Sequence, residues 1–224
     1  MMEEQHNTEE QKHYGLPRIG EKAPDFTAQT THGELSLDDY EGKWFVLFSH
    51  PADFTPVCTT EFVAFQGIYD QLREMNTELL GLSVDSITSH IAWIRNIEEN
   101  FDTKIEFPVI ADLDKQVATK FGMIMPESSG TEASRAVFVI DDKGTIRSLI
   151  YYPLTTGRNM GEIVRLVEAL RTTDKHGVST PADWTKGNKV VASPPTTVED
   201  ARARENDDSY ECVDWYFCKK DLKE

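Results

Sequence analysis

Apolar residues recur along this chain with two different spacings, and each spacing predicts a kind of element. Short continuous apolar runs predict buried strands at residues 44–49, 78–84 and 107–110. Apolar residues three or four positions apart predict helices at 56–74, 87–100 and 115–121. The last predicted elements are strands at 136–140 and 145–152 and a helix at 159–173, which Asn159 and Glu162 open as a capping pair.

The order of these elements predicts the fold class. Strands and helices alternate first, and a hairpin with a turn at residues 141–144 and a final helix follow. Alternation favours parallel strands, whereas a hairpin adds antiparallel ones. The sequence therefore predicts an α/β fold with a mixed central sheet.

The character of the chain changes near its two ends. Residues 1–16 are polar and predict a flexible tail, and residues 17–173 hold the periodic elements of one domain. Residues 174–224 show no sustained periodicity, yet they end in large aromatic residues among charged ones. We interpret this last stretch as an arm that docks on a second subunit or folds back on its own domain, and the sequence leaves both open.

Charge and apolar length exclude some classes of partner. The chain has 224 residues and a net charge of −16, which repels nucleic acid and anionic membranes. It has no apolar run of the ~18 residues that a membrane helix needs, and its start lacks a secretory signal pattern. These features predict a cytoplasmic protein with no nucleic-acid or membrane partner.

The candidate chemistry lies at a cysteine between a strand and a helix. Thr55 and Pro56 are suited to the N-cap and the first position of the helix, so Cys58 falls in its first turn. Unpaired N–H groups and the helix dipole stabilise a thiolate there, and the thiolate is the nucleophile. Taken alone, Cys58 is better interpreted as a small buried apolar residue at the start of a helix.

The residues around Cys58 resemble a known family. Pro51, Thr55 and Cys58 match the Pro-x-x-x-Thr-x-x-Cys signature of the peroxiredoxins. Similar segments occur at residues 24–26, 108–112, 134–141 and 152–159, so the resemblance covers about residues 17–218. The string 50–61 and the long arm are similar to the one-Cys-like subfamily, in its archaeal and bacterial form with an extra C-terminal cysteine pair. The resemblance implies a thioredoxin-like fold with a C-terminal dimerisation arm.

The resemblance also implies roles for the residues of the motif. Cys58 looks like the peroxidatic cysteine, which becomes a sulfenic acid. Thr55 looks like the hydroxyl that holds peroxide and thiolate, and Pro51 like the residue that shields the thiolate from water. Arg135 matches the arginine that stabilises the thiolate and orients the peroxide.

Further residues are implied in supporting and resolving roles. Arg158 matches a second arginine near the site, and the resemblance gives it a supporting role there together with Glu61. His50 looks like a residue of the pocket wall. Cys218 resembles a resolving thiol from a neighbouring subunit, with Cys212 as its relay partner. The alternative is that Cys212 and Cys218 form a structural or incidental disulfide.

The expected function is peroxide reduction without a cofactor or metal. The resemblance implies a thiol-specific peroxidase that reduces hydrogen peroxide and organic hydroperoxides and is recycled by a thioredoxin-like dithiol. It also implies homodimers assembled into a decamer, although nothing in the sequence fixes the ring size. The alternative function is a redox sensor or holdase chaperone that is controlled by oxidation of the same cysteine.

Overall fold

The computed structural model describes residues 15–222, which fall into two compact units. One unit holds the chain up to Tyr69 together with Asn76–Gly157, and the other holds Asp70–Met75 and the chain from Arg158 onward. Almost all of the tail predicted at residues 1–16 lies outside the described residues. Within residues 15–222, the helices are too short or too polar to cross a membrane.

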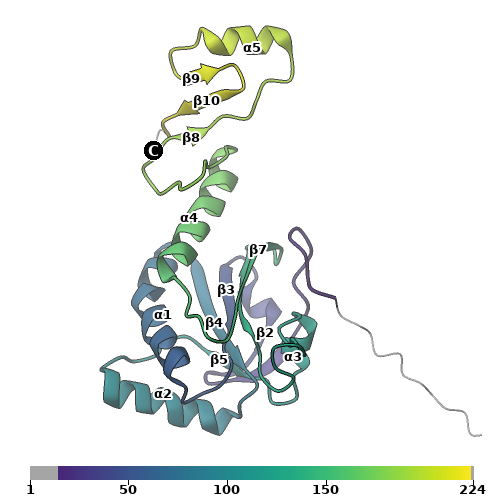
Figure 1. The fold of residues 1–224 in the computed structure, drawn as a ribbon, viewed down its shortest axis with the longest axis vertical. Coiled ribbons are helices and arrows are strands. Elements are labelled where there is room, and N and C mark those ends of the chain that lie inside the picture. The colour runs from purple at the N-terminus through teal and green to yellow at the C-terminus, as the bar shows by residue number, and fades with distance from the viewer. Residues whose placement is uncertain (1–14, 223–224) are drawn as a thin grey trace, which may run out of the picture. The chain divides into compact units, whose positions relative to one another are not determined.

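A seven-stranded mixed sheet forms the centre of the first unit (Figure 1). Its strands are β1 (Thr27–Thr30), β2 (Gly33–Ser36), β3 (Trp44–Ser49), β4 (Thr77–Ser83), β5 (Val109–Ala111), β6 (Arg135–Ile140) and β7 (Ile146–Tyr152). They lie in the order β2-β1-β5-β4-β3-β6-β7, and a short 3₁₀ helix, Leu37–Tyr40, follows β2. Strands β3, β4 and β5 are parallel, while β6 and β7 pair as the predicted antiparallel hairpin.

Helices cover both faces of this sheet. Helices α1 (Pro56–Glu74) and α2 (Ile87–Phe101) lie on one side, and α3 (Gln116–Lys120) lies on the other (Figure 1). Alternate residues of β3 supply the two cores, because successive side chains of a strand point to opposite faces. Phe48 stacks on Phe65 of α1 with ring centroids 3.9 Å apart, whereas Phe45 packs in the cluster that includes Phe121 just after α3.

The second unit begins with helix α4 (Met160–His176). The side chain of Asn159 accepts a hydrogen bond from the Glu162 N–H at 3.2 Å, so the predicted cap is present. Gly177 ends the helix with φ 60°, a left-handed conformation that glycine adopts without strain. The change in sequence character after residue 173 therefore lies near the end of this helix.

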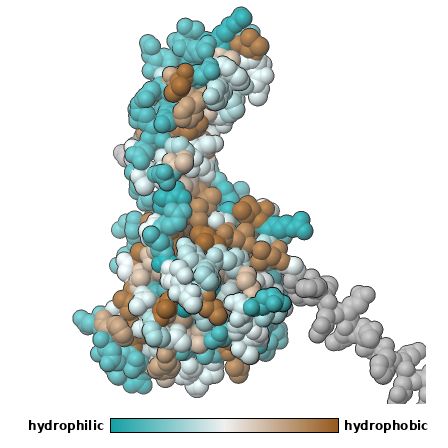
Figure 2. Space-filling view, in the orientation of Figure 1, coloured by the Kyte–Doolittle hydropathy of each residue, from teal (hydrophilic) through white to brown (hydrophobic). Residues whose placement is uncertain are grey.

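The rest of the second unit has more regular structure than its sequence predicts. It contains β8 (Val190–Val191), α5 (Val198–Glu205), β9 (Glu211–Asp214) and β10 (Phe217–Lys220), with the sheet order β8-β10-β9. A small core of Ala169, Val178, Trp184 and Val190 supports it. Figure 2 shows apolar side chains on the surface of this unit among hydrophilic ones. Its exposed large apolar residues are Val198, Val213, Trp215 and Tyr216.

Candidate functional site

The loop between β3 and α1 brings Cys58 to the start of a helix at the carboxyl end of the sheet. Strand β3 ends at Ser49 and α1 begins at Pro56, so Cys58 lies in the first helical turn, as predicted. The Cys58 side chain is fully buried. Phe54, in the same loop, has φ 55° and is exposed, which is a strained conformation for a bulky residue. Strain of this kind is concentrated at functional sites.

The register of the sheet brings Arg135 to the same place. Strands β3 and β6 are antiparallel with Phe48 opposite Val137, so the start of β6 lies beside the end of β3. The hydroxyl of Ser49 donates to the Ser134 carbonyl at 2.6 Å and accepts from the Ala136 N–H at 3.1 Å, which holds the two strand ends together. A residue 77 positions from Cys58 thereby becomes its neighbour.

Arg135 is the cation of the site. Its Nη1 lies 3.4 Å from Cys58 Sγ and 2.6 Å from a carboxylate oxygen of Glu61, and its Nε donates to the Leu154 carbonyl at 3.0 Å. Arg135 and Glu61 are 3% and 2% exposed at their side chains, so water screens this pair very little. The planar guanidinium can satisfy these directions at once, which a lysine ammonium cannot do in the same way.

The other predicted residues near the motif occupy distinct positions. Pro51 is buried, and Thr55 is half-buried. The Thr55 hydroxyl donates to the Ala52 carbonyl at 2.9 Å, so its proton is used within the loop. Arg158 is buried and belongs to the second unit. The structure therefore places Arg135 in contact with both Cys58 and Glu61.

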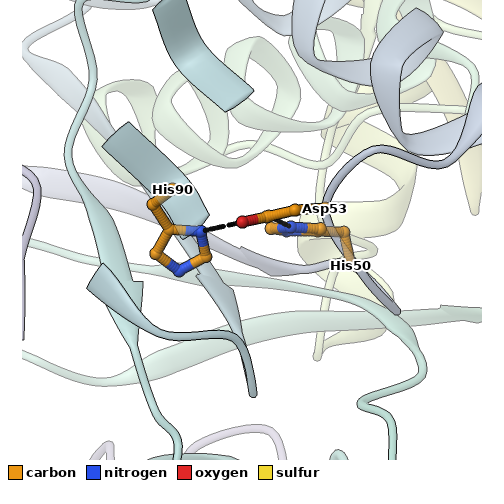
Figure 3. Close-up of side chains that lie close together, drawn as sticks. All are labelled: His50, Asp53 and His90. Atoms are coloured by element: carbon orange, nitrogen blue, oxygen red, sulfur yellow. Dashed lines mark hydrogen bonds and ion pairs between the residues drawn. The ribbon is translucent and has the colours of Figure 1, made fainter. Parts of the chain in front are cut away.

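A buried pair of histidines lies on either side of an aspartate in the same loop (Figure 3). The Asp53 carboxylate lies 3.0 Å from His50 Nε2 and 2.9 Å from His90 Nδ1. Burial opposes ionisation of Asp53, but the hydrogen bonds and charges of both histidines outweigh it and hold the pKa of Asp53 below its usual value. For His50 burial is the dominant cause, and it lowers the pKa despite the carboxylate.

Both ring nitrogens of His90 have a partner. Its Nε2 is 3.1 Å from the Ile110 carbonyl, and its Nδ1 faces the Asp53 carboxylate. An ionised carboxylate and a carbonyl only accept hydrogen bonds, so both ring nitrogens of His90 face acceptor atoms. His50 Nε2 faces the same carboxylate, and its buried Nδ1 has no hydrogen-bond partner among the described residues.

His50 was predicted as a pocket-wall residue, but sequence reasoning did not identify Asp53 or His90 as its partners. Asp53 lies within the motif, whereas His90 is on α2 and carries no local signal. The three side chains bring ligand-type nitrogen and oxygen atoms within 4.8 Å of one another, a donor set that zinc accepts. Their mutual hydrogen bonds already account for the arrangement, and we assign no metal to it.

The second unit contains the other two cysteines. Cys212 on β9 and Cys218 on β10 form a disulfide with an S–S distance of 2.13 Å, and Cys58 is the free cysteine of the chain. The two residues are opposite each other in the strand register. The groups of this chain that can take part in redox chemistry are therefore Cys58, which lies beside a buried cation, and the separate Cys212–Cys218 disulfide.

Comparisons with known families match both units. The AhpC/TSA family matches residues 19–149, and the C-terminal domain of 1-Cys peroxiredoxin matches residues 169–207. The chain is 57% identical over 216 residues to a peroxiredoxin of Aquifex aeolicus, covering 92% of this chain and 97% of that protein. It is 52% identical over 217 residues to a peroxiredoxin of Methanocaldococcus jannaschii, covering 92% of this chain and all of that protein.

Solved structures agree with these matches and confirm the predicted thioredoxin-like α/β fold. A yeast mitochondrial 1-Cys peroxiredoxin, described for thiol resolution through glutathione/thioredoxin systems, superposes with a TM-score of 0.83 at 37% identity, covering 92% of this chain and 100% of that one. A cysteine-to-serine mutant of peroxiredoxin 6 of Arenicola marina gives 0.82 at 32%, covering 93% and 100%. With both units matched along their length, the chain belongs to the peroxiredoxin family of thiol peroxidases.

Proposed function

We propose that Cys58 is the peroxidatic residue and that Arg135 is the group that makes it reactive. The Cys58 thiolate attacks the terminal oxygen of a hydroperoxide, the O–O bond breaks, and the leaving oxygen takes a proton and departs as water or an alcohol. Cys58 becomes a sulfenic acid. The observation that carries this proposal is the 3.4 Å contact between Arg135 Nη1 and Cys58 Sγ in a fully buried position.

The charge balance around Arg135 supports this role. Negative charge develops on the leaving oxygen during attack, and a fixed cation beside the reacting atoms stabilises it without reorganisation. Glu61 holds the guanidinium from the other side at 2.6 Å. We propose that Glu61 positions Arg135, because an acceptor-only carboxylate cannot itself donate to the peroxide.

The remaining motif residues have supporting roles in this proposal. Buried Pro51 shields the thiolate from water, and Thr55 holds the peroxide after its hydroxyl turns from the Ala52 carbonyl. Arg158 adds a second cation, and His50 contributes to the wall of the pocket. His50 is well suited to a wall because its ring packs 4.8 Å from the ring of Phe62 and is fully buried.

The cysteine pair of the arm resolves the sulfenic acid in this proposal. Cys218 of a neighbouring subunit condenses with oxidised Cys58, releasing water, and Cys212 then displaces Cys58 to form the Cys212–Cys218 disulfide. The bonded pair seen here supports the last step, since it is the product that the relay leaves. A thioredoxin-like dithiol restores the pair. This scheme needs at least a homodimer, and a cytoplasmic decamer remains our prediction.

Stopped-flow oxidation of the reduced protein by hydrogen peroxide tests the proposal. Wild type is compared with Cys58→Ser, Cys212→Ser and Cys218→Ser, and the products are separated on non-reducing gels. We expect fast oxidation to be lost only in Cys58→Ser. Cys212→Ser, the matched control, should accumulate a Cys58–Cys218 linked dimer that Cys218→Ser cannot form. Undiminished oxidation of Cys58→Ser would refute the central claim.

Turnover separates the enzyme from the alternative of a redox sensor or holdase. A peroxidase consumes many equivalents of peroxide when a dithiol donor is present, whereas a sensor is oxidised once per activation. Steady-state peroxide consumption with thioredoxin and its reductase therefore decides between them. Oxidation limited to one equivalent per Cys58 would favour the sensor.

A further inference from the structure

The disulfide of the second unit is unequally exposed at its two ends. Cys218 is fully buried, whereas Cys212 is partly exposed. The neighbours of Cys212 along β9 are open to solvent, with Val213 82% exposed and Glu211 and Asp214 also exposed. The unit therefore leaves part of Cys212 open to solvent and covers Cys218 completely, and the Cys212 sulfur lies 4.0 Å from the Arg204 carbonyl oxygen.

Thiol–disulfide exchange makes this difference chemically important. The attacking thiolate must contact one sulfur of the disulfide and approach it from the side opposite the bond that breaks. In the bonded pair Cys218 has no exposed surface, whereas part of Cys212 is open to solvent. A thiolate in solution therefore has access to Cys212 and not to Cys218 while the disulfide is intact.

We propose that the dithiol reductant attacks Cys212, and that Cys218 is the leaving sulfur. This inference rests on the proposed function, because it assigns the first step by which the arm is recycled. The reductant thiolate forms a bond to Cys212 Sγ, the Cys212–Cys218 bond breaks, and Cys218 leaves as a thiolate. The second thiol of the reductant then attacks the first sulfur of the reductant, which is bonded to Cys212, and releases Cys212 as a thiolate. Two electrons pass to the arm, and the reductant becomes a disulfide.

The surroundings of Cys218 favour completion of this sequence. Its sulfur lies 3.4 Å from the Asp214 carbonyl oxygen and 3.7 Å from that of Trp215. Carbonyl oxygens accept a hydrogen bond from a thiol, so these two oxygens can accommodate the Cys218 S–H that forms when the disulfide opens.

A covalent trap measures which sulfur is attacked. The full chain with Cys58→Ser and an oxidised arm is mixed with a thioredoxin whose second active-site cysteine is serine, and with 2-mercaptoethanol in a parallel sample. Reactions are quenched in acid within milliseconds to seconds. The freed cysteine is alkylated, and the peptides are identified by mass spectrometry. The same exchange is run in guanidinium, where the fold no longer covers either sulfur.

We expect both probes to be found on Cys212 in more than about tenfold excess over Cys218 in the folded protein, with near-equal partition in guanidinium. Trapping on Cys218, equal partition in the folded chain, or a folded disulfide that reacts with neither probe would each overturn the proposal. Because the experiment uses no peroxide and no Cys58, its failure is distinct from failure of the peroxidase proposal, which the Cys58→Ser oxidation measures.

Discussion

Replacing Arg135 with methionine removes a cation from between two buried groups while keeping much of its length. Glu61 then lies in a site only 2% exposed without its partner at 2.6 Å, and the Leu154 carbonyl loses the donor at 3.0 Å. Loss of one partner of a buried ion pair costs about 3–5 kcal/mol. Loss of the donor beside the reacting sulfur should lower the rate constant with hydrogen peroxide by roughly 10²–10³-fold.

A second substitution separates these two effects. In Arg135→Met/Glu61→Gln no unpaired carboxylate remains, so most of the lost free energy of unfolding should return, while the rate stays low because Cys58 still has no cation. Urea denaturation of the reduced proteins measures the first quantity, and stopped-flow oxidation measures the second. Arg18→Met is the control for loss of one positive charge, because the Arg18 side chain is 85% exposed and its ion pair contributes little. Recovery of the rate in the double variant would refute the assignment of Arg135.

Three further predictions concern pH, packing and capping. Because the pKa values of His50 and Asp53 are lowered in the folded protein, the unfolded chain binds more protons below about pH 6.5 and pH 4 respectively. The free energy of unfolding should therefore decrease as the pH is lowered through these windows, by at most ~1.4 kcal/mol per pH unit for each group. In urea titrations, His50→Gln should flatten the pH dependence in the upper window. Phe48→Ala should cost about 3–5 kcal/mol in the same assay, since its ring is fully buried on Phe65; a loss under about 1 kcal/mol would contradict the packing argument. Asn159→Ala should lower stability by ~1 kcal/mol, whereas Asn159→Ser should retain most of it, and equal losses would argue against capping.

Much of the first unit was predictable because its local signals agree with its tertiary structure. Helix α1 runs from Pro56 to Glu74 as predicted, since its apolar residues repeat every three or four positions and proline begins it. Strand β3 has the predicted bounds because a short, continuous apolar run between polar residues is typical of a strand that is buried on both faces. In the second unit β8, β9 and β10 were missed, because strands of two to four residues are too short to show a period. Helix α5 was missed because it has no buried residue and therefore no apolar face.

The candidate site divides in the same way between sequence and structure. The position of Cys58 in the first turn of a helix follows from the residues beside it, and so does the proximity of Glu61 one turn later. The contacts of Arg135 and His90 do not, because both come from distant elements that only strand register and helix packing bring together. The sequence by itself thus determined that Cys58 lies in the first turn of a helix, and the resemblance of its motif made it the candidate nucleophile. The tertiary structure decided which charges lie beside Cys58 and which cysteine of the arm is buried, because burial and long-range pairing are properties of the folded chain.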